Sequence, residues 1–130
     1  MNSFAAVRNL FDTRCNGCHN GTASGLIPGG ATRVKLSANW SGTTTLSDAD
    51  LYTTLTTALP GTVPTCSTKV LVAPSDLANS FIVTKVSSAV PGCGGQMPVG
   101  CATAGSVAAP CLTAGEIGII TGWINANAPH

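Results

Sequence analysis

The sequence predicts an all-α protein that forms a single domain over residues 1–130. Three segments carry apolar residues at helical spacing, and each begins at a residue that can cap a helix: Asn2 or Ser3, Ser47, and Thr113. A chain of 130 residues is long enough for one domain with a modest apolar core.

The first expected helix begins after Asn2 or Ser3 and places four apolar residues on one stripe: Phe4, Val7, Leu10 and Phe11. Such a stripe fits any amphipathic helix that packs on a core. It therefore predicts structure and not function.

A cysteine pair follows this helix directly. Cys15-Asn16-Gly17-Cys18-His19 reads C-x-x-C-H, the attachment signature of c-type haem. Two thiols at this spacing can add to the two vinyl groups of one porphyrin, and His19 then lies beneath the ring, where a ring nitrogen can bind the iron. C-x-x-C alone would also fit a redox dithiol, half of a zinc site or a disulfide. The adjoining histidine favours haem.

The middle of the chain alternates loops with one clear helix. Residues 20–45 are rich in Gly, Ser, Thr and Asn, which predicts a long loop of the kind that wraps a ligand. Ser47-Asp48-Ala49-Asp50 is a capping sequence, and Leu51, Leu55 and Leu59 predict a helix over about 48–58 that ends before Pro60-Gly61. Residues 60–74 are expected to form a connector.

The last third contains an irregular segment and a final helix. Residues 91–98 combine three glycines with Gln96-Met97-Pro98 and cannot form regular structure, so their backbone can lie close to a flat ligand. Thr113 and Glu116 form a capping box for a final helix. Its glycines, Gly115, Gly118 and Gly122, share one face and suggest a close crossing by Leu10 or Phe11 of the first helix.

These features occur in the order found in one known family. From Cys15-Asn16-Gly17-Cys18-His19, Gln96-Met97-Pro98 and the ending Leu112–Ile117 with Trp123-Ile124, the chain resembles the small monohaem cytochromes c of class I over about residues 4–128. The resemblance implies about three to five orthogonal helices, wrapped with long loops around one covalently bound haem c. It also favours a short helix over a strand in the β-branched run 80–86, and a near-perpendicular crossing of the first and last helices.

The resemblance also implies a set of site residues. Cys15 and Cys18 would attach the haem, His19 would be the proximal iron ligand and Met97 the distal one. Pro28 is the candidate for the carbonyl that accepts a hydrogen bond from Nδ1 of His19, and three further residues could donate to a haem propionate: Arg33, Lys35 and Trp40. Each of these residues also has a simpler possible role. Met97 could fill a gap in the core, and Pro28 could be a turn residue. Arg33, Lys35 and Trp40 could be solvated surface residues.

A haem with His and thioether ligands has no open position, so the implied function is one-electron transfer between other redox proteins and not enzymatic catalysis. The alternatives are a haem c electron-entry domain of a larger redox enzyme or cell-surface assembly, a haem-based sensor of small ligands, and a thiol protein without haem. A sensor would need a free sixth position, so that alternative depends on Met97.

Composition limits partners and location. Charged residues make up 8% of the chain and the net charge is +1, which argues against nucleic acid as a partner, and no apolar run approaches the length of a membrane span.

The four other cysteines predict two disulfides, paired as Cys66–Cys93 and Cys101–Cys111 among three pairings; a zinc site of these four thiolates is the alternative. Haem attachment and disulfides indicate a periplasmic or extracellular location. The sequence shows no signal peptide, so an already trimmed chain is expected.

Overall fold

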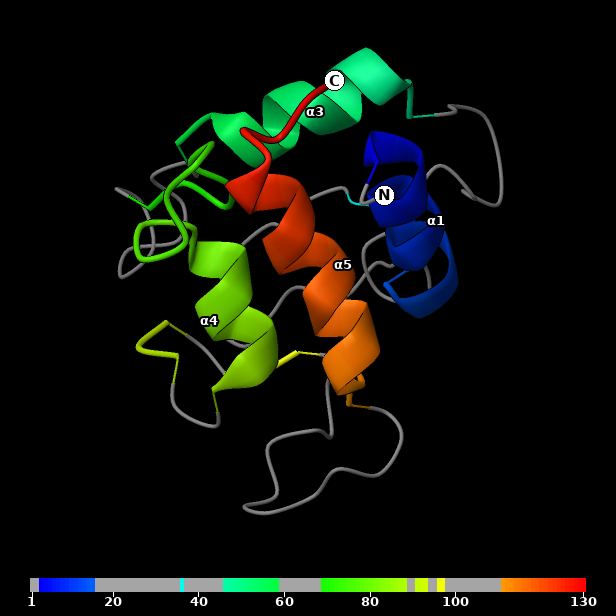
Figure 1. Ribbon diagram of the computed structural model, residues 1–130. Helices are drawn as coiled ribbons and strands as arrows, with labels where there is room; N and C mark the ends of the chain where they lie inside the picture. Colours follow the sequence, from blue (N-terminus) through cyan, green and yellow to red (C-terminus); the bar gives the residue numbers. More distant parts are fainter. Residues whose placement is uncertain are drawn as a thin grey trace, which may run out of the picture.

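The structure is a computed structural model that describes residues 3–15, 36, 46–58, 69–88, 91–93, 96–97 and 111–130. These ranges contain the helices α1 (Phe4–Arg14), α3 (Asp48–Thr56), α4 (Phe81–Ser87) and α5 (Ala114–Asn125) (Figure 1). Within the described ranges there is no β-strand, only two isolated bridges, Ala58–Val70 and Ala73–Asp76. The predicted all-α class is therefore confirmed for the described part of the chain.

The predicted helix starts are confirmed in atomic detail. Oγ of Ser3 accepts a hydrogen bond from the backbone N–H of Ala6 (3.3 Å), and Oγ of Ser47 accepts one from Asp50 (3.1 Å). At α5 the capping box is complete, because Thr113 accepts from the N–H of Glu116 (3.2 Å) and the Glu116 carboxylate accepts from the N–H of Thr113 (2.7 Å). Each bond satisfies a backbone N–H that has no partner inside its own helix.

Two of the expected helix bounds can be compared directly. The run at 80–86 is helical and not a strand, as α4 shows. The helix expected over 48–58 ends at Thr56, since Ala58 pairs with Val70 in a β-bridge and so leaves the helical path.

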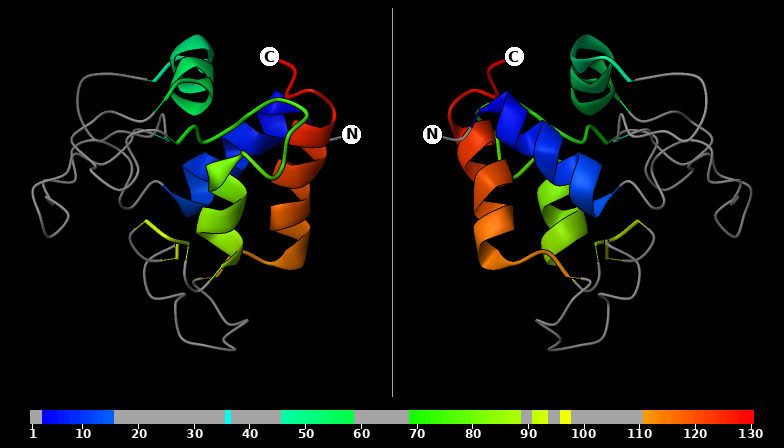
Figure 2. Two further views of the ribbon diagram at one scale, coloured as in Figure 1. Left: turned by 90° about the vertical axis from the view of Figure 1, so that its left-hand side faces the viewer. Right: turned by 90° about the vertical axis from the view of Figure 1, so that its right-hand side faces the viewer.

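The apolar core is centred on α5. Trp123, Ile120 and Ile124 are almost fully buried, and α5 packs against both α1 and α4 (Figure 1). The ring of Phe4 lies 5.6 Å from that of Trp123, between centroids. Figure 2 shows α1 inclined to α5, with α3 set to one side of the other three helices. The predicted contact between the first and last helices is thus confirmed.

The predicted glycine notch is wrong where the structure tests it. Gly115 and Gly118 are exposed, and an added Cβ at Gly118 would meet no described atom within 4 Å. The reason is the helix periodicity: α5 buries the side of Ile120, Trp123 and Ile124, while these two glycines lie on the opposite side. Gly115 and Gly118 therefore do not form a notch for a side chain of α1.

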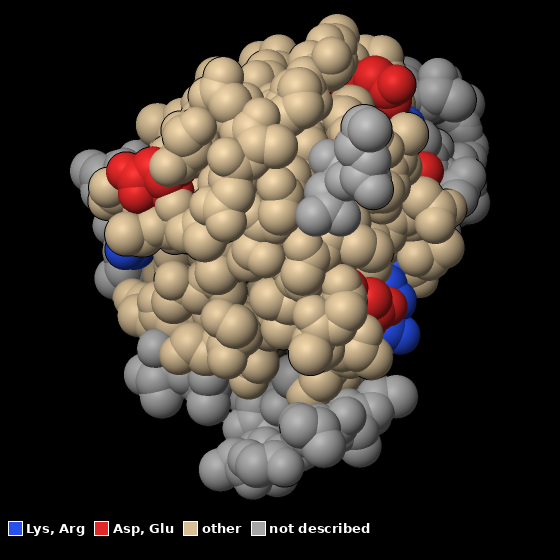
Figure 3. Space-filling model, viewed as in Figure 1, with Lys and Arg blue, Asp and Glu red and all other residues tan. Residues whose placement is uncertain are grey.

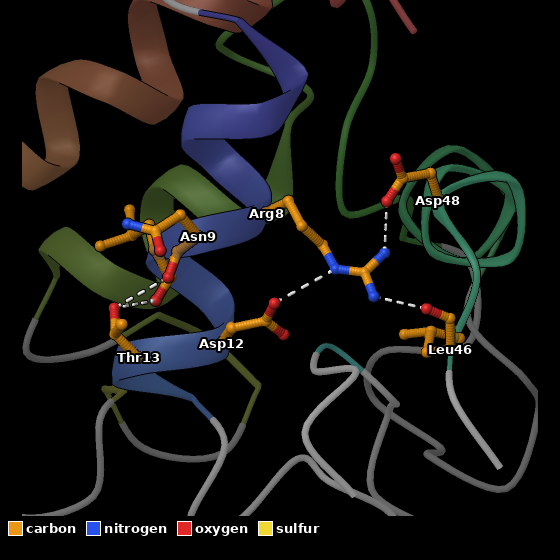
Figure 4. Close-up of polar contacts among 7 residues, drawn as sticks. Arg8, Asn9, Asp12, Thr13, Leu46 and Asp48 are labelled. Atoms are coloured by element: carbon orange, nitrogen blue, oxygen red, sulfur yellow. Dashed lines mark hydrogen bonds and ion pairs between the residues drawn. The ribbon is translucent and has the colours of Figure 1, made fainter.

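Arg8 joins α1 to the start of α3. Its Nη1 lies 2.6 Å from Oδ1 of Asp48 and its Nε 3.3 Å from Oδ2 of Asp12, while Nη2 donates to the carbonyl of Leu46 (Figure 4). The Arg8 side chain is only 15% exposed, so its charge requires these partners. The contact fixes the orientation of α3 relative to α1.

The described residues that precede α4, 69–80, are hydrogen-bonded to both α3 and α5. The N–H of Val72 donates to the carbonyl of Leu55 (2.8 Å), and that of Ser75, which has a φ of +63°, donates to the carbonyl of Ile124 (2.9 Å). Ser80 is fully buried; its hydroxyl accepts from the N–H of Ala73 (2.9 Å) and lies 2.7 Å from the carbonyl of Asp76, to which it can donate. These bonds anchor the start of α4 to the rest of the fold.

Among the residues that the structure describes, no helix is both long enough and apolar enough to cross a membrane.

Candidate functional site

Two of the predicted site residues fall in the described part of the chain, Cys15 and Met97. The others lie outside the described residues: Cys18, His19, Pro28, Arg33, Lys35 and Trp40. The roles predicted for these residues therefore stay predictions.

Cys15 is the C-cap residue of α1. Its backbone N–H donates to the carbonyl of Phe11 (2.9 Å), and the residue is partly buried and packs against the apolar core. Phe11 is 1% exposed, so the last turn of α1 rests firmly on the core. The C-x-x-C-H motif consequently begins at a residue whose backbone is fixed by the helix before it.

Arg14 ties this end of α1 to the start of α5. Its Nη2 donates to the carbonyl of Cys111 (2.7 Å), and its Nε lies 3.1 Å from Oε1 of Glu116. Glu116 also completes the capping box of α5, so one carboxylate serves both contacts. Arg14 is not among the site residues predicted from the sequence, although a cation in the last helical turn, directly before Cys15, was a signal for it.

Met97 lies in an irregular segment, called the Met97 segment below, of which residues 91–93 and 96–97 are described. This segment is hydrogen-bonded to the last turn of α4. The N–H of Met97 donates to the carbonyl of Lys85 (2.8 Å), and Nε2 of Gln96 donates to the carbonyl of Val86 (3.1 Å). A helix leaves its last carbonyls without partners inside the helix. At α4 the Met97 segment supplies those partners, which fixes the segment without any regular structure of its own.

The side chain of Lys85 holds the same segment at a second point. Its Nζ donates to the carbonyl of Cys93 (2.6 Å) and lies 5.9 Å from the ring centroid of Phe81. Partial burial lowers the pKa of Lys85 below its usual value, because desolvation disfavours the charged amine. Nζ of Lys69 lies over the same ring, at 5.1 Å. Lys85 is not predicted as a site residue, because nothing in the sequence around it distinguishes it from an ordinary surface lysine.

The Met97 side chain is partly buried, but it is not among the side chains that pack against the core in the described ranges. Those partly buried neighbours are Cys15, Tyr52, Leu77, Val83, Ile117 and Ile119. The two roles predicted for Met97, distal iron ligand and gap-filler in the core, therefore both stay predictions.

Cys93 and Cys111 are both buried and both disulfide-bonded. The predicted partners, Cys66 and Cys101, lie outside the described residues, so the pairing stays a prediction. The carbonyls of both described cysteines accept hydrogen bonds from cations, Lys85 at Cys93 and Arg14 at Cys111. Among the described residues, no cluster of three or more His, Cys, Asp or Glu side chains could hold a metal ion.

The donor types in the described part suit a covalently bound haem. Cys15 offers a thiol at a fixed helix end, and Met97 offers a thioether in a segment that α4 holds in place. α1 ends at Cys15, and α4 is hydrogen-bonded to Met97. Both helices pack against α5. In comparisons with known proteins, no family model, no curated protein and no solved structure matched the chain.

Proposed function

We propose that this protein is a one-electron carrier that holds one haem c, attached through Cys15 and Cys18, with His19 and Met97 as the iron ligands. The observation that carries the proposal is the position of the motif. C-x-x-C-H begins at the C-cap of a helix whose last turn packs on the core through Phe11, so the backbone of its first cysteine has a fixed position.

The chain's own residues would have distinct tasks. Cys15 and Cys18 would hold the cofactor covalently, and His19 would bind the iron. Met97 would supply the sixth ligand, with its backbone fixed by the carbonyl of Lys85. When bound, the haem supplies a single Fe(III)/Fe(II) couple. Thioether ligation and an apolar pocket both favour Fe(II), so these residues would raise the reduction potential above that of a haem with two histidine ligands.

The packing of α1 against α5 supports the finer fold that the resemblance implies, orthogonal helices of the cytochrome c type. The low charge of the surface supports docking that needs no strong electrostatic patch. Figure 3 shows only a few charged groups on the face that carries α4 and α5, most of them near its margins. Other redox proteins would be the donor and the acceptor.

The disulfide-bonded state of Cys93 and Cys111 supports an oxidising location, the periplasm or the cell surface. Haem attachment in the same compartment would be consistent with this location.

The experiment is expression of the chain in a host with haem-attachment machinery. The intact mass should exceed that of the polypeptide by one haem, and the haem should stay with the protein in acidified acetone. A redox titration should then show one reversible one-electron step. A Cys15→Ser, Cys18→Ser variant is the matched control and should lose the covalent haem. A wild-type chain of bare polypeptide mass would refute the proposal.

A further inference from the structure

Lys85 contacts the Met97 segment in two ways. Its main-chain carbonyl accepts the N–H of Met97 (2.8 Å), and its ammonium group donates to the carbonyl of Cys93 (2.6 Å), four residues earlier. The segment between these points is therefore held at both ends by one residue of α4. Gln96 adds a third bond, to the carbonyl of Val86.

The hydrogen bond from the Lys85 ammonium group to the carbonyl of Cys93 is stronger than an ordinary surface hydrogen bond. A hydrogen bond from a charged donor is stronger than one between two neutral groups. The side chain is partly buried and extends past the ring of Phe81, so its path from α4 to Cys93 is constrained. Cys93 itself is 5% exposed, and without Lys85 its carbonyl would lose a partner in a site that admits little water.

We infer that Lys85 is a positioning residue for the distal ligand: its ammonium group fixes the Cys93 end of the segment and so keeps Met97 in the place where it can bind iron. This inference rests on the proposed function, since it assumes that Met97 is a ligand. Loss of the ammonium group should let the segment move away from α4 more often. Met97 would then leave the iron in a larger fraction of molecules.

The measurement is the apparent affinity of the ferric holoprotein for imidazole, a probe that binds iron only when Met97 has left. Apparent affinity rises in proportion to the population of the open form. Lys85→Met keeps most of the aliphatic stem and removes the donor, so imidazole should bind on the order of ten times more tightly than to the wild type. Lys85→Arg, which keeps a cationic donor, should restore most of the wild-type affinity.

Lys69→Met is the matched control. Lys69 lies over the same ring of Phe81, and its replacement removes the same charge. Among the described residues, its Nζ makes none of the hydrogen bonds that hold the Met97 segment. Its imidazole affinity should stay within about twofold of the wild type. Equal affinities of Lys85→Met and Lys69→Met would overturn the inference. So would a Lys85→Met protein with a lower free energy of unfolding and unchanged imidazole affinity, because that is the result of a purely structural role.

Met97→Ala in the same assay separates this inference from the proposed function. If Met97→Ala binds imidazole no better than the wild type, Met97 is not the ligand and the proposed ligation fails. If Met97→Ala binds imidazole more tightly and Lys85→Met does not, only the role of Lys85 fails. Should Lys85→Met not fold, Lys85→Gln and Lys69→Gln provide the same comparison with a smaller change in polarity.

Discussion

Arg14 and Cys111 are joined by a hydrogen bond of 2.7 Å, from Nη2 of the arginine to the backbone carbonyl of the cysteine. The bond links Arg14, directly before the C-x-x-C-H motif, to Cys111, two residues before Thr113, the N-cap of α5. Glu116 contacts the same guanidinium group, with its Oε1 3.1 Å from Nε. The start of the motif is thereby connected to the start of α5.

The Arg14–Glu116 ion pair can be measured by a double-mutant cycle. Arg14→Met removes the guanidinium group, and Glu116→Gln removes the charge but keeps an acceptor for the capping box. The two side chains are 29% and 25% exposed, so we expect a coupling of about 0.5–1 kcal/mol in the free energy of unfolding. Urea unfolding of the four proteins at low and high salt gives this coupling. A coupling of zero at low salt would show that only the bond to Cys111 stabilises the contact.

Replacement of Met97 by alanine tests the distal ligand directly. The ferric holoprotein should lose the weak absorption band that reports iron–sulfur bonding, and cyanide or CO should gain access to the iron. The potential should fall by on the order of 100 mV, because axial ligands set haem potentials over a wide range. Absorption spectroscopy and a redox titration provide both readouts. An unchanged ferric spectrum and potential would mean that another residue binds the iron.

Peptide mapping without reduction tests the disulfides. We expect Cys66–Cys93 and Cys101–Cys111 peptides, since both described cysteines are bonded. The chain-entropy estimate gives about 3.5 kcal/mol for the first and about 3 kcal/mol for the second, before any strain is counted. A Cys66–Cys101 peptide would contradict this pairing, and so would any link that joins Cys93 to Cys111.

Ser80→Ala should destabilise the protein by about 1–3 kcal/mol. Ser80 is fully buried, and removal of its hydroxyl leaves the N–H of Ala73 and the carbonyl of Asp76 without this partner. Ser87→Ala is the control, because Ser87 is exposed at the end of the same helix; we expect it to stay within about 0.5 kcal/mol. Thermal unfolding measures the stability of the two variants. Equal free energies of unfolding would show that the hydrogen bonds of Ser80 do not stabilise the protein.

The sequence was sufficient to predict the helices, because their signals are local. Ser3, Ser47 and Thr113 each cap a helix as their side chains predict, and the stripe Phe4, Val7, Leu10 and Phe11 is the buried face of α1. The run at 80–86 was harder. Its β-branched residues favour a strand by propensity, and the family resemblance favoured the helix that the structure shows.

Contacts between distant segments could not be predicted in the same way. The glycines of α5 suggested a close helix crossing, yet a periodic pattern does not tell which of two faces meets α1. Arg14 and Lys85 act through backbone carbonyls of Cys111 and Cys93, and a carbonyl is present at every position, so no side-chain pattern marks the pair. For the candidate site, Cys15 and Met97 could be identified from their chemistry, whereas the residues that hold them required the structure.

The contact between Phe4 and Trp123 spans almost the whole length of the chain. The core therefore closes only when the last helix is available, and contacts of such long sequence separation slow the folding reaction. A chain still under synthesis or translocation would expose the apolar stripe of α1 until α5 arrives, and exposed apolar surface favours aggregation. Truncation before Ala114 should for this reason yield an aggregating chain and not a smaller folded domain.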